Sequence, residues 1–253
     1  MTRTVAIIQA RMSSSRFAGK VLQPLLNRPM IVFMVERVRM ARHVEATLVA
    51  TSTDPSDDPL EQALIQAGVP VYRGPLEDVL GRFVGAARAH GADHVVRLTG
   101  DCPLIDGDLI DATLELLVAQ QLDYASNVSP PRWPDGLDVE AMTRDALEST
   151  ALEAARPSER EHVTPFLRDN PQRFRQAGLA SLIDLSALRW TVDHADDLDF
   201  VRRLLAAARV NDSTAFDRFD LLRALERHPA LATLNRHQRN EGYAASLANE
   251  AAT

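Results

Sequence analysis

A short apolar run, Val5-Ala6-Ile7-Ile8, is followed at once by a loop with three cations and three hydroxyls. A continuous apolar run of this length is typical of a strand buried on both faces, as in a parallel sheet with helices on either side. Ligands of such sheets bind beyond the carboxyl ends of the strands. The sequence therefore predicts an α/β fold with a mostly parallel central sheet, and a ligand site in the loop after the first strand.

The residue types of this loop suit a phosphate group. Arg11 and Arg16 offer forked donors, and Lys20 offers a point charge. The serines at 13–15, together with Gly19, allow the backbone amides to turn toward an anion. The loop has neither the Walker pattern nor the dinucleotide glycine pattern. The alternative is a solvated basic loop that caps the next helix, and the loop alone favours neither interpretation.

Carboxylates follow two further predicted strands. The strand that begins at His94 ends in Thr99 and Asp101, and the strand that begins at Leu188 ends at Asp193. Asp101 is expected at the same edge of the sheet as the cationic loop. A hard cation such as Mg²⁺ takes one or two carboxylates together with substrate phosphates. For Asp101 alone, a role as a turn former is equally consistent with the sequence.

The remaining elements follow from apolar spacing, prolines and glycines. The predicted helices are 29–41, 59–67, 76–90, 106–121 and 143–155, with another from 157; the further strands are 46–51, 69–74 and 123–127, and a turn into a strand covers 135–142. Strand 69–74 is placed at the sheet edge because Pro70 cannot donate to a ladder. Ser56 or Asp57 is expected to cap helix 59–67, and Ser158 with Glu161 to form a capping box.

Several charged side chains have two interpretations at this stage. Asp78 and Arg82 share one face of helix 76–90, as a surface ion pair or as part of a site. Asp138 and Glu140 project to one face of their strand, toward solvent or toward a ligand. His162 has no metal-ligand partner four residues later, so a zinc site is not predicted there.

The composition limits the class of protein. With 253 residues, 45% hydrophobic and 25% charged, the chain is typical of a globular protein with a sizeable core. Its net charge of −7 argues against nucleic-acid binding through bulk electrostatics. We expect neither a signal peptide nor a membrane span, and hence a cytoplasmic protein. The single cysteine, Cys102, excludes an internal disulfide, and packing is favoured over nucleophilic chemistry for it.

The cationic loop also carries a resemblance to a known family. Ala10-Arg11-x-x-Ser14-Ser15-Arg16-x-x-Gly19-Lys20 resembles the signature loop of the sugar-acid cytidylyltransferases, the group that includes the CMP-3-deoxy-manno-octulosonate and CMP-sialate synthetases. Segments 78–82, 135–140, 159–165 and 235–243 are similar to the spore coat polysaccharide biosynthesis F branch of that group. This sequence departs from the family at Ala18, where proline is frequent, and at His194, where threonine is common.

The resemblance implies one Rossmann-like domain of the nucleotide-diphospho-sugar transferase type, in three layers, over residues 1–253. Within it, 128–165 is expected to form an extension for the acceptor and for dimerisation, and 217–253 a helical C-terminal tail. The homodimer is implied by the resemblance alone.

The resemblance also implies roles for individual residues. The expected catalytic residues are Arg11, Arg16, Lys20, Asp101 and Asp193, with the two aspartates as Mg²⁺ ligands. The expected nucleotide contacts are Ala10, Arg11, Ser14, Ser15, Arg16, Lys20, Asp78, Arg82 and Thr99, with Asp78 and Arg82 as an ion pair that lines the pocket. The expected acceptor contacts are Asn127, Asp135, Asp138, Glu140, Arg160 and His162, of which Arg160 and His162 are equally open as dimer contacts.

These roles imply transfer of CMP from CTP to an acidic sugar, of the nonulosonic or octulosonic type, with release of pyrophosphate, for surface polysaccharide biosynthesis. The choice of cytosine rests on the resemblance alone. A glycosyltransferase of related fold would show Asp-x-Asp where this chain has Asp101-Cys102-Pro103. A non-catalytic nucleotide-binding regulator would not need both Asp101 and Asp193. An enzyme is therefore favoured over both alternatives.

Overall fold

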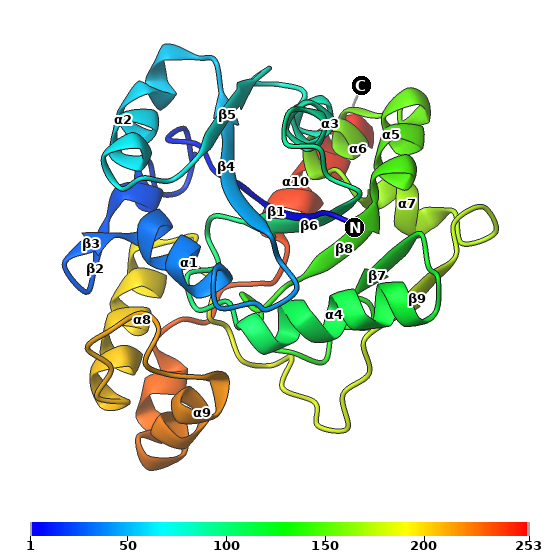
Figure 1. Cartoon of the computed structure of the whole chain (residues 1–253). Helices are drawn as coiled ribbons and strands as arrows, with labels where there is room; N and C mark the ends of the chain where they lie inside the picture. The colour runs from blue at the N-terminus through cyan, green and yellow to red at the C-terminus, as the bar shows by residue number, and fades with distance from the viewer. Residues whose placement is uncertain (1, 252–253) are drawn as a thin grey trace.

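A seven-stranded sheet in the order β5-β4-β1-β6-β8-β7-β9 forms the centre of the computed structural model, which describes residues 2–251 (Figure 1). Its strands are β1 (Thr4–Gln9), β4 (Ala46–Ser52), β5 (Val71–Gly74), β6 (His94–Thr99), β7 (Tyr124–Ser126), β8 (Glu140–Thr143) and β9 (Gln176–Gly178). β5, β4, β1 and β6 are parallel, whereas β8 is antiparallel to both of its neighbours. A small separate sheet pairs β2 (Pro24–Leu25) with β3 (Arg28–Pro29). The prediction of a mostly parallel central sheet is confirmed.

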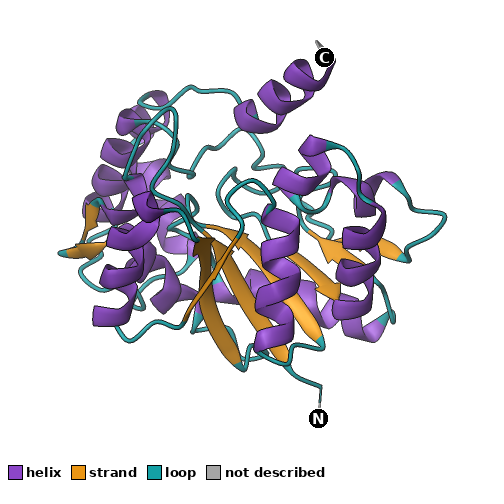
Figure 2. Cartoon of the chain, turned by 90° about the horizontal axis from the view of Figure 1, so that it is seen from above, coloured by secondary structure: helices purple, strands orange, loops and turns teal. Residues whose placement is uncertain are grey.

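Helices cover both faces of this sheet and complete three layers (Figures 1 and 2). They are α1 (Met30–Val38), α2 (Asp58–Gln66), α3 (Val79–Ala89), α4 (Gly107–Ala119), α5 (Arg144–Glu153), α6 (Pro157–His162), α7 (Pro165–Asp169), α8 (Ala195–Ala207), α9 (Arg218–Arg227) and α10 (Glu241–Ala251). Short 3-10 turns cover Lys20–Leu22, Pro55–Asp57 and Pro229–Thr233. Within residues 2–251, no helix has the length and apolar character that a membrane crossing requires.

The side chains of β1 alternate between two cores, one on each face of the sheet. Ala6 and Ile8 pack in the core that contains α1, α4 and α8, whereas Val5 and Ile7 pack in the core of α3 and α5. All four side chains are fully buried. This arrangement explains the uninterrupted apolar run, because a strand covered on both faces has no solvent side.

Local signals in the sequence fix several element boundaries. The Asp106 carboxylate caps α4 by accepting hydrogen bonds from the N–H groups of Asp108 and Leu109, at 3.1 and 3.3 Å. β5 follows Pro70 and lies at the edge of the sheet, as its proline predicts.

The strand predicted from Leu188 to Asp193 is wrong. Over the described chain, this segment pairs only through an isolated bridge between Asp135 and Arg189. The N–H of Trp190 donates to the carbonyl of Asp135 at 2.6 Å, so the hydrogen bonds go to a turn and not to a neighbouring strand. Gly136 permits this approach, because a Cβ there would lie 2.5 Å from the Trp190 carbonyl carbon. An apolar pattern predicts an extended segment but not the partner of its backbone.

The capping box predicted for Ser158 and Glu161 is also wrong. Glu159 supplies the carboxylate instead, and it accepts from the N–H of Arg156 at 3.0 Å. The Ser158 hydroxyl donates to Glu250 of α10 at 2.9 Å. The nearby C-terminal helix therefore takes the polar group that the sequence assigns to a cap.

Most of the C-terminal tail predicted for 217–253 is helical, with α9, a 3-10 turn and α10 joined by an irregular stretch over 234–240. Residues 252 and 253 lie outside the described residues. α10 packs on α6 and lies beyond the carboxyl ends of the parallel strands (Figure 2). Of the predicted extension 128–165, Glu140–Thr143 belongs to the central sheet as β8.

Candidate active site

A cavity of about 510 Å³ lies at the carboxyl edge of the parallel strands. The loops after β1 and β6, the segments 135–140 and 161–168, and the tail residues 239–249 contribute to its lining. Fourteen residues of the predicted site line it: Ala10, Arg11, Ser14, Ser15, Arg16, Lys20, Arg82, Thr99, Asp101, Asp135, Asp138, Glu140, His162 and Asp193. The fold thus brings side chains from distant stretches of the chain to one place.

The shape of the cationic loop depends on a residue outside it. Asp57, expected to cap α2, makes no cap through its side chain. Its carboxylate is fully buried and accepts from the N–H groups of Met12, at 2.7 Å, and Ser52, at 3.1 Å. The carbonyl of Met12 in turn accepts from the N–H of Gly19 at 2.9 Å, and Gly19 has a φ of 69°. These bonds fold the loop back on itself.

Lys20, Asp101 and Asp193 form the charged centre of the cavity. Lys20 Nζ lies 2.8 Å from Asp193 Oδ1 and 3.5 Å from Asp101 Oδ2. Arg16 Nη2 also lies 2.8 Å from Asp193 Oδ1. Lys20 is the only lysine among the 28 lysines and arginines of the sequence. A lysine ammonium is a compact point charge, which suits a position between two carboxylates better than a planar guanidinium does.

The attraction between opposite charges keeps the side chains of Lys20 and Asp193 charged. Burial alone would lower the pKa of the Lys20 ammonium, but Asp101 and Asp193 outweigh burial and raise it above its ordinary value. Burial alone would raise the pKa of the Asp193 carboxyl, but Lys20 and Arg16 hold it well below its usual range. The centre therefore presents fixed charges to a ligand at neutral pH.

Arg189 contacts Asp193 of this centre and two further aspartates. Its guanidinium is buried and donates to Asp135 Oδ2 at 2.9 Å and to both carboxylate oxygens of Asp197 at 2.9 Å. It also reaches Asp193 Oδ2 at 3.3 Å. Asp197 Oδ2 accepts from the N–H of Asp193 at 2.8 Å. The sequence analysis does not identify Arg189, because its role depends on the fold of an irregular segment.

Acidic side chains of the predicted acceptor site line the other half of the cavity, each with a cation beside it. Arg239 Nη2 donates to Asp138 Oδ1 at 2.6 Å. Glu140 is buried, pairs with Arg97 and accepts from the Tyr124 hydroxyl. Burial alone would raise the pKa of Glu140, but Arg97 brings it below its ordinary value. Glu140 is therefore ionised at neutral pH.

The C-terminal tail supplies lining residues that the sequence analysis does not identify. Arg239, Glu241 and Tyr243 face the cavity from this segment. The rings of His162 and Tyr243 pack edge-on, with centroids 5.0 Å apart. The one relevant signal in the sequence is the similarity of 235–243 to the family branch, and similarity alone does not say where a segment folds.

Three predicted site residues have structural partners and are not among the described residues that line the cavity. Arg160 donates to both oxygens of Asp78, at 3.0 and 2.6 Å. Asn127 donates to the carbonyl of Leu137 at 2.7 Å and accepts from the N–H of Val139 at 2.8 Å. These side chains hold the walls of the site together.

The ion pair predicted between Asp78 and Arg82 is wrong. Arg82 is buried, and its guanidinium donates to the carbonyls of Pro75, at 2.9 Å, and Leu76, at 3.0 Å. The Asp78 carboxylate caps α3 through the N–H of Gly81 at 2.9 Å. Helical spacing places both side chains near one another, but capping directs the carboxylate to the helix end.

Cys102 is buried beside the cavity, with its Sγ 3.3 Å from Thr99 Oγ1. Burial raises the pKa of the thiol well above its ordinary value. A thiolate nucleophile is therefore disfavoured, in agreement with the packing role expected from the sequence.

Asp101 and Asp193 fit a hard divalent cation. Both carboxylates lie within 3.5 Å of one atom, Lys20 Nζ, so they face a common point. Mg²⁺ prefers oxygen ligands and combines one or two carboxylates with phosphate oxygens. The neighbouring cations repel a bare metal ion, and a triphosphate that arrives with the metal would offset this repulsion.

A comparison with protein families identifies the family to which this chain belongs. Residues 5–193 match the family model described as cytidylyltransferase. The chain belongs to the cytidylyltransferase family. The resemblance of its cationic loop to the sugar-acid cytidylyltransferases is thereby confirmed.

Relatives of this chain match either nearly all of it or about half of it. The spore coat polysaccharide biosynthesis protein SpsF of Bacillus subtilis is 32% identical over 240 residues, which cover 92% of this chain and 98% of that protein. The 3-deoxy-manno-octulosonate cytidylyltransferase of Anaeromyxobacter sp. is 38% identical over 117 residues, 45% of this chain and 47% of that one. A solved cytidylyltransferase structure from Leptospira borgpetersenii superposes with a TM-score of 0.88 at 29% identity, covering 94% and 100% of the two chains.

Proposed function

We propose that this cytidylyltransferase transfers CMP from CTP to an oxygen of an acidic sugar and releases pyrophosphate. The observation that carries the proposal is the meeting of Arg16, Lys20, Asp101 and Asp193 at one end of the cavity. A triphosphate needs cations at its leaving group, and nucleotidyl transfer needs mainly positioning and charge neutralisation. Membership of the family supports CTP as the donor.

The side chains that line the phosphate half of the cavity have different roles in this proposal. The Arg11 side chain is 41% exposed and pairs with Glu161 at 3.6 Å, so a phosphate can replace this weak pair. Arg16 and Lys20 stabilise the negative charge that builds up on the leaving pyrophosphate. Ser14 and Ser15 line the same wall and offer hydroxyl donors.

Asp101 and Asp193 are the residues that would hold Mg²⁺ in this scheme. A Mg²⁺ held by these two carboxylates would supply positive charge that offsets the charge of the phosphates and lowers the cost of attack at phosphorus. Arg189 keeps Asp193 in position, because it contacts Asp193 Oδ2 while Lys20 contacts Oδ1.

The acceptor half contains cations with unused donors, which suit the carboxylate of a sugar acid. Burial alone would lower the pKa of the Arg168 guanidinium, but the charge of Glu140 raises it, and this guanidinium lies 5.7 Å from the centre of the Tyr243 ring at the cavity wall. Arg97 Nε is buried without a hydrogen-bond partner in the described structure. Arginine recognises carboxylates through its forked donors. The names of the Bacillus and Anaeromyxobacter relatives also support a sugar-acid acceptor for surface polysaccharide.

The decisive experiment measures pyrophosphate release with Mg²⁺, each nucleoside triphosphate in turn, and a panel of nonulosonic and octulosonic acids. We expect release with CTP and one class of acid. Asp101→Asn and Asp193→Asn should each lower kcat by about 10²-fold or more. Asp199→Asn is the matched control, because this exposed carboxylate of α8 pairs only with Arg203 in the described structure.

Two outcomes would overturn the proposal. Release that is unaffected by either active-centre substitution would remove Asp101 and Asp193 from the reaction. Absence of release with every pair, together with tight binding of a nucleotide sugar, would reassign the chain to glycosyl transfer. The cytoplasmic location and the homodimer are further proposals, and sedimentation of the purified chain tests the second.

A further inference from the structure

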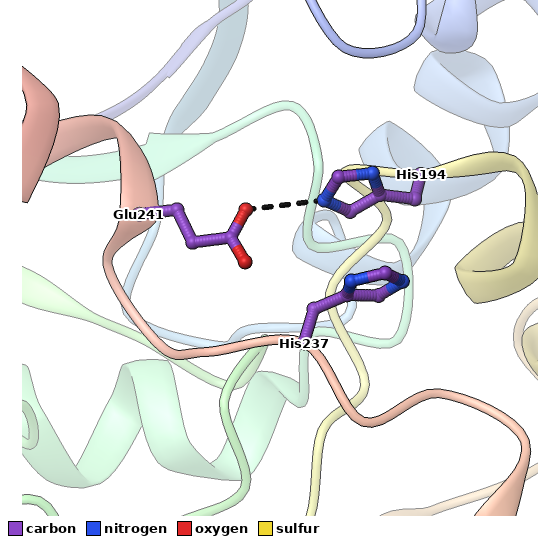
Figure 3. A group of neighbouring side chains, drawn as sticks. All are labelled: His194, His237 and Glu241. Atoms are coloured by element: carbon purple, nitrogen blue, oxygen red, sulfur yellow. Dashed lines mark hydrogen bonds and ion pairs between the residues drawn. The ribbon is translucent and has the colours of Figure 1, made fainter.

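Two histidines and a glutamate meet beside the cavity, outside the roles assigned above. His194 begins α8, His237 lies in the irregular stretch of the tail, and Glu241 begins α10 (Figure 3). One ligand atom from each lies within 4.8 Å of the other two. The side chains are 25% to 30% exposed, so a small ion has access to them.

The orientation of the two imidazoles distinguishes this group from an ordinary surface ion pair. His194 Nε2 lies 3.1 Å from Glu241 Oε2. The two rings stack with centroids 3.8 Å apart and planes 19° apart. Figure 3 shows the His237 ring nitrogen next to the side-chain stem, Nδ1, on the side of Glu241. Nitrogen and oxygen donors of all three residues therefore face one region.

The His237 ring nitrogen that points away from Glu241, Nε2, carries a proton that it donates to Asp196. His237 Nε2 lies 2.9 and 3.0 Å from the two oxygens of Asp196. An imidazole that donates Nε2–H to a carboxylate has its lone pair on Nδ1. Histidines that bind metals commonly have such an outer carboxylate, which sets the tautomer and the ring orientation. Asp196 thus prepares His237 as a ligand, an arrangement that a simple hydrogen bond to Glu241 would not need.

We propose that His194, His237 and Glu241 form a zinc site. Two imidazoles and one carboxylate are a donor set that Zn²⁺ accepts, with a fourth position left for water. The carboxylates of Glu241 and Asp196 together offset the charge of the divalent ion, which would replace the weak contact between Arg16 Nε and Glu241 Oε2, 3.8 Å apart. Imidazole ligands also separate this site from the pair Asp101 and Asp193, whose oxygens suit Mg²⁺.

The site joins parts of the chain that are distant in sequence. His194 directly follows Asp193 of the charged centre, whereas His237 and Glu241 belong to the tail that lines the cavity. Zinc bound here fastens the tail against the start of α8. It therefore stabilises one wall of the cavity without taking part in the reaction.

The test is a titration of the untagged full chain with ZnCl₂ by calorimetry, in excess Mg²⁺ to occupy oxygen-rich sites. We expect one Zn²⁺ per chain. His237→Ala and Glu241→Gln should each weaken binding by about 10²-fold, and Asp196→Asn by about 10-fold or more, since outer carboxylates typically contribute this much. His43→Ala is the matched control: His43 Nε2 also lies 3.1 Å from a carboxylate, Glu115, but it belongs to no described group of three ligands.

A second measurement does not depend on affinity. Co²⁺ should give visible absorption bands of a site with nitrogen ligands in the native chain and in His43→Ala, but not in His237→Ala. Zn²⁺ should also slow amide hydrogen exchange over 241–251 in the native chain and in His43→Ala, but not in His237→Ala. Failure of the native chain to bind stoichiometric Zn²⁺, or binding that survives both His237→Ala and Glu241→Gln with folded spectra, would overturn the proposal.

Discussion

The Asp57 carboxylate accepts a hydrogen bond from the backbone N–H of Met12, 2.7 Å away. The bond connects the start of α2 with the cationic loop after β1. The Asp57 side chain is fully buried, so we do not expect water to take the place of its carboxylate in a variant that lacks it. The loop that would bind phosphates is therefore shaped by a residue that does not line the cavity.

Asp57→Ala should lower the free energy of unfolding by about 3 kcal/mol, because it leaves the buried N–H of Ser52 and the partly buried N–H of Met12 without an acceptor. It should also raise KM for CTP through a disordered loop. Denaturant unfolding and steady-state kinetics measure the two effects. Asp54→Ala is the control, since Asp54 caps the same turn through Ser56 but is exposed; it should cost no more than about 1 kcal/mol. Equal losses in the two variants would contradict this account.

The pair Arg160 and Asp78 should behave as a structural link between α6 and α3. In a double-mutant cycle with Arg160→Met and Asp78→Asn, we expect a coupling energy of about 1 kcal/mol, because the bidentate pair is partly exposed. Asparagine keeps an oxygen for the Gly81 N–H, so the cap of α3 survives. KM for the acceptor should stay unchanged. A raised acceptor KM in a stable Arg160→Met variant would return Arg160 to the binding site.

Asp138 should make stability fall as pH rises from about 4 to about 7. Burial raises the pKa of its carboxyl to about 7, and Asp135 and Glu140 add to the rise, although Arg239 opposes it. Over this window the folded chain keeps a proton that the unfolded chain, with its ordinary pKa of 3.8, releases. The free energy of unfolding then decreases by up to about 1.4 kcal/mol per pH unit.

Asp138→Asn should remove this contribution, so its difference in stability from the native chain should change with pH only between these two pKa values. Unfolding in urea at a series of pH values measures it. A constant difference for Asp138→Asn would refute the raised pKa.

Lys20 should not tolerate arginine. Lys20→Met removes the charge between Asp101 and Asp193 and should lower kcat for pyrophosphate release by about 10²-fold or more. Lys20→Arg keeps the charge but needs more room than the two carboxylates leave, so it should recover little of the lost rate. Arg227→Met, at an exposed position, is the control. Full activity of Lys20→Arg would show that charge alone matters at this position.

The sequence predicts best those strands that are covered on both faces of the sheet. β1 is read from a continuous apolar run, and β4 and β6 from largely apolar runs, because strands covered on both faces have no solvent side. The segment around Trp190 alternates apolar and polar residues, which is also a strand pattern, yet its backbone bonds to the turn at Asp135. The apolar pattern of a sequence indicates which residues are buried, whereas the hydrogen-bond partners of the backbone depend on the tertiary fold.

The candidate site divides in the same way. Arg11, Arg16, Lys20 and Asp101 follow strand ends, so topology alone brings them together. Arg239 reaches the same cavity from an irregular segment and Glu241 from the start of α10, and Arg189 supports Asp193 from outside the lining. Neither spacing nor composition predicts these positions. Residues that support or cover a site are therefore the ones that require a structure.

The single lysine gives this chain an unusual chemical selectivity. A reagent that acylates primary amines meets one ε-amino group in the 253-residue sequence, and that group lies between Asp101 and Asp193. Burial and the two carboxylates keep this amine covered and protonated, so acylation should be slow in the folded chain and faster once the charged centre comes apart. The rate of acylation at one amine would therefore report the integrity of the site without the introduction of a new residue.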